Sequence, residues 1–156
     1  MALFCRRAIA LLSLTLCAGA TPAAPAQHTT PLVARPAPPE LIGELQPIVE
    51  RARQRFEARD AAGVLAYVSE QYRSGGSTKA DLRQQILAMF NLYDAIRTKV
   101  TIDQVQLVDG GVWIYTTGEI SGRLPFVGWV PMLAWQSEPE VARREEAGWR
   151  LFGFQN

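Results

Sequence analysis

The spacing of apolar residues changes once along the chain, near Lys99, and this change limits the folds available to it. Before it, apolar residues recur every three to four positions, as at Leu45, Ile48 and Ala52, which predicts helices. After it, apolar and polar residues alternate, which predicts strands. Helices followed by antiparallel strands predict an α+β layer fold.

Three helices are predicted in the first part of this fold. Because a proline inside a helix is strained, the first helix is expected to begin near Pro47 or to kink there. Asp60 is a predicted N-cap of a second helix, which covers residues 61–70. Thr78 and Asp81 resemble a capping box and open the third helix.

The strand region contains two predicted hairpins. The alternation slips by one residue near Asp103, which indicates a β-bulge. Asp109-Gly110-Gly111 is a predicted hairpin turn, and the strand after it covers residues 112–121. A last hairpin joins residues 141–145 to residues 149–155. These strands supply the β layer of the fold.

Residues 1–20 are predicted to be a secretory signal peptide. Arg6 and Arg7 precede an apolar run that is too short to span a bilayer as a stable helix. Ala18-Gly19-Ala20 then has the pattern of a cleavage site. We therefore expect an exported bacterial protein, periplasmic or secreted. A lipoprotein is the alternative, and the protein is expected on a membrane only if Cys17 is lipidated.

Residues 21–39 are rich in Pro, Ala and Thr and are expected to form a flexible linker. The folded domain is then predicted to span residues 40–156. The single histidine of the chain, His28, lies in the linker. Nothing around it could hold it as a base or a ligand, so it is expected to be solvated.

The residues that remain for the domain exclude several kinds of chemistry. Both cysteines, Cys5 and Cys17, lie in the predicted signal peptide, so no disulfide or thiol chemistry is expected. Without histidine or cysteine, no metal site and no cofactor are expected. Removing Arg6 and Arg7 from the 16 basic residues leaves 14 against 15 acidic ones. A near-neutral domain lacks the excess of basic residues that is typical of proteins that bind nucleic acid.

Four segments together point to a known family: FEARDAAGVLAYVSEQYRSGG, the helix that begins at Thr78, VQLVDGGVWIYTTGEISG and REEAGWRLFGFQN. Their order resembles the nuclear transport factor 2-like superfamily, which includes ketosteroid isomerases and polyketide cyclases. The resemblance covers residues 45–156. It implies three N-terminal helices packed in a strongly curved antiparallel sheet, a cone with a cavity open at one end. None of the segments is a catalytic signature, and a fold does not by itself imply a function.

The resemblance also implies which residues face the cavity. In the strand 112–121, Thr116 and Gly118 point into the pocket, while Trp113 and Tyr115 point outward. Aromatic residues are unusual on a wet sheet face, so a homodimer interface is expected there. Two scattered exposed aromatic residues are the alternative. The expected pocket residues are Tyr67, Phe90, Tyr93, Thr116, Gly118, Phe126, Trp129 and Trp135.

The stretch LPFVGWVPMLAW, residues 124–135, carries no charge. Its two prolines break a helix or a central strand. Residues 132–135 are expected to enter the sheet, and Phe126 and Trp129 to cover the mouth of the cavity. Two alternatives are that the whole segment packs as core, or that it touches a membrane or an envelope protein.

No acid–base pair that converges on the cavity is evident. Ketosteroid isomerase-like members use a tyrosine and carboxylic acids, and the candidates here are Asp103, Glu119 and Tyr93. Glu119 has the outward parity of Trp113, and Asp103 lies at the expected bulge. The sequence therefore favours a non-enzymatic module that binds a small apolar ligand or serves in assembly. The alternative is an isomerase-, cyclase- or dehydratase-like enzyme that uses one carboxylate and a tyrosine.

Overall fold

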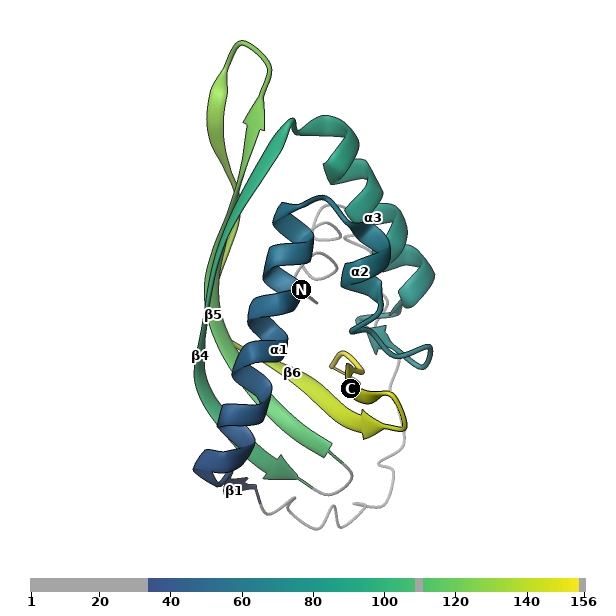
Figure 1. Ribbon diagram of the computed structural model, residues 1–156, viewed down its shortest axis with the longest axis vertical. Helices are drawn as coiled ribbons and strands as arrows, with labels where there is room; N and C mark the ends of the chain where they lie inside the picture. The colour runs from purple at the N-terminus through teal and green to yellow at the C-terminus, as the bar shows by residue number, and fades with distance from the viewer. Residues whose placement is uncertain (1–33, 109–110, 155–156) are drawn as a thin grey trace, which may run out of the picture.

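A computed structural model describes residues 34–108 and 111–154 (Figure 1). Its helices are α1 (Pro39–Glu57), α2 (Ala61–Leu65) and α3 (Lys79–Leu92). Its strands are β1 (Arg35–Pro36), β2 (Arg73–Ser74), β3 (Ser77–Thr78), β4 (Ala95–Val108), β5 (Gly111–Leu124), β6 (Gly128–Glu145) and β7 (Gly148–Leu151). The predicted α+β order is confirmed. The predicted signal peptide, the linker up to residue 33 and the turn residues Asp109 and Gly110 lie outside the described residues.

One antiparallel sheet, in the order β1-β4-β5-β6-β7, forms most of the structure. Figure 1 shows the long strands β4, β5 and β6 curving past α1, with α2 and α3 on the opposite side of α1. The strongly curved sheet around the helices is confirmed. β2 and β3 form a separate small hairpin before α3.

The end of the predicted linker belongs to the sheet. Arg35 and Pro36 pair with the edge of β4, and the N–H of Ala37 donates to the carbonyl of Val105 at 3.0 Å. An edge strand offers unpaired backbone groups to any chain that can reach them. The expectation of a flexible spacer up to residue 39 is therefore wrong from Arg35 onward.

Helix α1 does not begin at Pro47, so the first of the two expectations for this proline is wrong. It begins at Pro39, a position where a missing N–H costs nothing, and continues through Pro47 to Glu57. An interior proline costs a helix about 3 kcal/mol. Leu45 and Phe56, on the two sides of Pro47, are 2% and 3% exposed, and burial of each large apolar side chain contributes about 1.5–3 kcal/mol. The free energy gained by packing thus offsets the cost of the proline.

Both predicted helix caps are confirmed. The Asp60 carboxylate accepts a hydrogen bond from the N–H of Gly63 at 2.8 Å. Thr78 and Asp81 form the reciprocal capping box at the start of α3, with 2.9 Å from the Thr78 N–H to the Asp81 carboxylate. The pKa of Asp81 lies below its usual value, mainly because its carboxylate accepts a hydrogen bond from the Thr78 backbone and, to a smaller extent, because it accepts one from the Thr78 hydroxyl.

The second helix is shorter than predicted. It ends at Leu65, where the sequence pattern continues to residue 70. The chain instead pairs with the end of β7: the N–H of Leu151 donates to Tyr67 at 2.8 Å, and the N–H of Ser69 donates to Leu151 at 2.9 Å. A tertiary contact therefore replaces the last helical turn.

The predicted bulge and strand faces agree with the structure. The β4–β5 register shifts between Ile102 and Gln104, which places the bulge at Asp103. In β5 the inward residues Val112, Ile114, Thr116 and Ile120 are buried. Trp113 and Tyr115 lie on the other face and are half-buried. The Trp113 ring packs edge-on against Phe154, with 5.5 Å between ring centroids.

The late apolar stretch forms a hairpin. β5 continues to Leu124, three residues form the turn, and β6 begins at Gly128 and runs to Glu145. The strand expected at residues 141–145 is therefore the end of an 18-residue strand.

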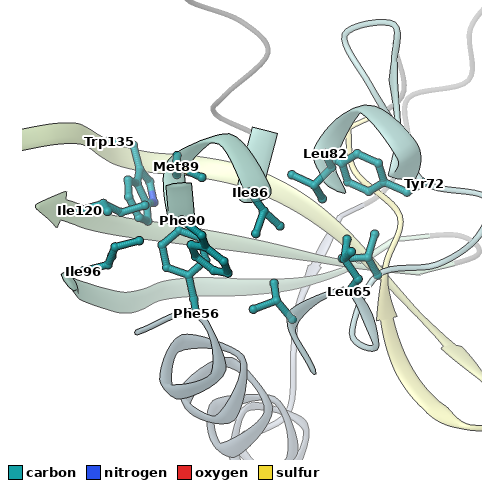
Figure 2. Packing of buried hydrophobic residues seen from close by; sticks show 12 residues of the cluster. Phe56, Leu65, Tyr72, Leu82, Ile86, Met89, Phe90, Ile96, Ile120 and Trp135 are labelled. Carbon is teal, nitrogen blue, oxygen red and sulfur yellow. The ribbon is translucent and has the colours of Figure 1, made fainter. Parts of the chain in front are cut away.

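The core lies between the sheet and the helices. Figure 2 shows Phe56 of α1 against Phe90 of α3, with 5.3 Å between their ring centroids. Ile96, Ile120 and Trp135 of the sheet lie beside Phe90 at one end of the same cluster. This packing holds α1 between the sheet and α3 and so shapes the space beside α1.

Candidate functional site

A cavity of about 140 Å³ lies between α1 and the concave face of the sheet. Its wall is mostly apolar. α1 contributes Leu45, Ile48, Val49, Ala52 and Phe56, and the strands contribute Val100, Ile114, Ile120, Trp135, Ala142 and Leu151. The cavity thus has α1 on one side and the curved strands on the other.

Glu140 is the one carboxylate among the described residues that line this cavity. It lies on β6 opposite Ile114 of β5, and it is 7% exposed. Burying an acid in an apolar site costs free energy, so a carboxylate placed there is a candidate for binding or proton transfer.

A bulge in β6 turns Glu140 inward. Thr116 pairs with Glu138, but Gly118 pairs with Trp135, so β6 has one residue more than β5 over this interval. Ser137, inside the bulge, has a left-handed backbone with φ of 49°. The extra residue reverses the parity of β6, which puts both Trp135 and Glu140 on the cavity side.

Hydroxyl groups lie in the same wall. The Thr116 hydroxyl accepts a hydrogen bond from the Trp135 indole N–H at 3.0 Å, which fixes the Trp135 ring in the wall. The Thr98 hydroxyl is buried and makes no hydrogen bond within the described residues. Tyr67 also lines the cavity. The wall that contains Glu140 thus also contains hydroxyl groups.

Arg53 of α1 stands at the edge of the cavity with its charge compensated. Its guanidinium lies 2.7 Å from Glu50 and 2.7 Å from Glu57, and it donates to the Thr98 carbonyl at 3.3 Å. The hydrogen bonds from Arg53 and then from Gln54 lower the pKa of Glu50 to about 2. The bond to Glu50 raises the pKa of Arg53. Arg53 therefore joins α1 to β4 at this edge.

The structure brings only part of the predicted pocket together. Tyr67, Thr116 and Trp135 line the cavity. Phe90 packs in the core against Phe56, and Tyr93 lies at the end of α3 against Gly122.

Gly118 does not line the cavity, because the Trp135 ring lies against its Cα. Gly118 does lie on the inward face of β5, as predicted, but the Trp135 ring covers it.

Phe126 and Trp129 do not cover the cavity mouth. Phe126 is 110% exposed at the tip of the β5–β6 hairpin, and Trp129 is 38% exposed beside it. The tip extends away from the cavity, because β4 ends its pairing with β5 at Ala95, opposite Arg123. The interpretation of these residues as a lip is wrong.

The three catalytic candidates also lie outside the cavity. Asp103 accepts a hydrogen bond from Thr117 at 2.7 Å on the outer face, and Glu119 forms an exposed ion pair with Lys99 at 2.7 Å. Tyr93 lies at the end of α3.

Sequence reasoning missed Glu140 because it lies in SEPEVARRE, a stretch with the composition of a solvated surface. The only local signal was that Glu140 lies two residues before Ala142, which is buried on the same face of β6.

Two further observations concern metals and membranes. In residues 34–108 and 111–154, no group of three or more His, Cys, Asp or Glu side chains could hold a metal ion. Among the helices described, none has the length and apolar character needed to cross a bilayer.

No family model and no curated protein matches the sequence of the chain. Solved structures do match its fold. A putative dehydratase from the NTF2-like family of Streptomyces avermitilis is 12% identical with a TM-score of 0.59, and the match covers 75% of this chain and 94% of that one. A ketosteroid isomerase-like protein from Erwinia carotovora atroseptica is 17% identical with a TM-score of 0.55, covering 74% and 93%.

A third match shows the same fold within a longer protein. Bd1075 from Bdellovibrio bacteriovorus is 12% identical with a TM-score of 0.58, and the match covers 71% of this chain but only 39% of Bd1075. At these identities the likeness concerns the fold alone. With the curved sheet, the enclosed α1 and the cavity between them, these matches show that the chain has the nuclear transport factor 2-like fold.

Proposed function

We propose that this protein is an exported module that binds a small, mostly apolar molecule in its cavity, and that a donor group on this ligand bonds to Glu140. The buried carboxylate in a mostly apolar wall carries this proposal. Ligand sites of this kind combine apolar walls with a few placed polar groups that orient the ligand. The predicted signal peptide supports a role outside the cytoplasm.

The size of the cavity limits the ligand. An apolar cavity of about 150 Å³ accommodates benzene, and this cavity measures about 140 Å³. We therefore expect the buried part of the ligand to be one ring, or a chain of similar volume. A donor on that ring would reach Glu140, and the rest would face Leu45, Ile114 and Ile120.

The test compares probes that differ only in their polar group. Benzylamine and benzyl alcohol carry donors, toluene carries none, and benzoate carries a negative charge. Titration calorimetry should find the highest affinities for benzylamine and benzyl alcohol, a lower affinity for toluene and the lowest for benzoate. A hydrogen bond to a charged group contributes about 1.5–3 kcal/mol, so Glu140→Gln should reduce the preference for benzylamine over toluene by at least about tenfold.

Glu119→Gln is the matched control, because it makes the same change to an exposed carboxylate outside the cavity. It should leave the ranking of the probes unchanged. Equal affinities of toluene and benzylamine for the wild-type protein would contradict the proposal, as would an equal effect of the two substitutions.

A second candidate function is acid–base catalysis on a small carbonyl compound. It rests on the presence of Glu140 and Tyr67 in the same wall. In this proposal Glu140 accepts a proton from the carbon next to the carbonyl, and Tyr67 donates a hydrogen bond to the oxygen that becomes negative. Glu140 then gives a proton back to the same carbon, and because the proton on Glu140 exchanges with water while the enolate is bound, the carbon can gain a solvent hydrogen; no other reactant is needed.

Proton exchange tests the enzyme proposal directly. Cyclohexanone in heavy water should gain deuterium next to its carbonyl faster with the protein than without it, as measured by NMR. Glu140→Gln should abolish the acceleration and Glu119→Gln should retain it. Binding of the aromatic probes without any acceleration of exchange would leave the binding module as the function and reject the enzyme.

A further inference from the structure

The tip of the β5–β6 hairpin is an exposed apolar surface that the cavity does not use. Pairing with β4 stops at Arg123, so residues 124–128 have no third strand beside them, and Figure 1 shows this hairpin projecting beyond α3. Phe126 is 110% exposed, Val127 70% and Trp129 38%. Contact with another apolar surface would stabilise these side chains.

The backbone presents Phe126 outward at a local cost. Phe126 has a left-handed backbone with φ of 64°, which is unusual for a bulky residue. The N–H of Val127 donates to the Pro125 carbonyl at 2.8 Å and holds the turn closed. A glycine would adopt this conformation without strain, so an aromatic residue here points to a function for the tip.

The base of the tip is positively charged. Arg97 and Arg123 are exposed, and neither forms an ion pair within the described residues. The Arg97 guanidinium lies over the Trp129 ring, 4.0 Å from its centroid. Arg59 also reaches this end through the Asp94 carbonyl. Asp94, three residues before Arg97 in the chain, is also exposed and forms no ion pair within residues 34–108 and 111–154.

We infer that this tip docks on an anionic lipid bilayer, with Phe126 and Val127 inserted below the headgroups. Tryptophan favours the bilayer interface, and arginine can keep its charge in the headgroup region while its stem contacts apolar surface. Anionic headgroups attract basic residues held near them. A soft bilayer can accept a narrow projecting tip, whereas a folded protein partner would need a pocket shaped to receive it.

Co-sedimentation of the full chain with vesicles tests the inference. One vesicle preparation contains phosphatidylcholine alone, and the other contains equal parts of phosphatidylcholine and phosphatidylglycerol. The wild type should bind the second preparation more strongly. The double variant Phe126→Ser, Val127→Ser should lose at least about tenfold in partitioning. Arg123→Gln should lose about fivefold on the anionic vesicles only.

Leu92→Ser is the matched control, because Leu92 is 58% exposed but lies at the end of α3 rather than on the hairpin. It should bind as the wild type does. The first 33 residues are the same in every variant, so the difference between variants reports on the hairpin. Equal binding of the wild type and the double variant overturns the inference. Binding to isolated cell membranes but not to protein-free vesicles assigns the tip to a protein partner and overturns it as well.

Discussion

Replacing Gly118 by alanine should destabilise the protein, although glycine is a poor strand residue. A Cβ at Gly118 would lie 2.5 Å from the Lys99 carbonyl oxygen and even closer to the Trp135 ring. Trp135 cannot move freely, because its indole N–H is bonded to Thr116 at 3.0 Å and its side chain is 8% exposed. Overpacking of a rigid core costs about 1–3 kcal/mol.

Gly43→Ala provides a control with the opposite sign. Gly43 lies within α1, and nothing lies within 4 Å of a Cβ built on it. Alanine there should increase the free energy of unfolding by about 0.5–1 kcal/mol, because glycine loses more conformational entropy in a helix.

Urea denaturation followed by circular dichroism measures both changes on the same scale. With a urea m-value of about 1–3 kcal/mol/M, 1 kcal/mol corresponds to a shift in the unfolding midpoint of about 0.3–1 M urea. Gly118→Ala with wild-type stability would refute the close packing of Trp135 against β5. Destabilisation by both substitutions to the same extent would show that the general loss of glycine, rather than the contact, is responsible.

Four further predictions concern other parts of the chain. The lowered pKa of Glu50 stabilises the fold above pH 4.5, and this contribution should disappear between pH 4.5 and 2; the pH dependence of unfolding in Glu50→Gln should lack that step. Asp60→Ala removes the cap of α2 and should lower the free energy of unfolding by about 1 kcal/mol in urea titrations. If the outer sheet face is a homodimer interface, sedimentation velocity should show a dimer for the wild type and a monomer for Tyr115→Arg, and a monomeric wild type would contradict the interface. Mass spectrometry of the exported protein should find Thr21 at its N-terminus, whereas a lipid-modified N-terminus would support the lipoprotein alternative.

Local features of the fold were predictable because they depend on residues a few positions apart. The caps at Asp60 and Thr78 need only a side chain and a nearby backbone N–H. The bulge at Asp103 is visible as a slip in alternation. The buried face of β5 follows from its two-residue period.

Features that depend on distant contacts were mispredicted. α1 begins eight residues before Pro47 rather than at it, because that helix packs on the sheet and the packing outweighs the cost of an interior proline. The chain after Leu65 leaves the helix because Leu151, near the other end of the chain, offers backbone partners. Arg35 joins the sheet because β4 has an open edge.

The sequence by itself determined the order of helices and strands, the buried face of β5, and a domain without histidine or cysteine. Only the tertiary structure decided that Glu140 enters the cavity and that Phe126 lies outside it. The side of a sheet on which a residue lies depends on every bulge before it, and the bulge near Ser137 shows only when β6 is paired with β5. Whether a hairpin tip covers a cavity or projects from the domain depends on where the neighbouring strand stops. That point is set by the pairing of β4 with β5 rather than by any local spacing.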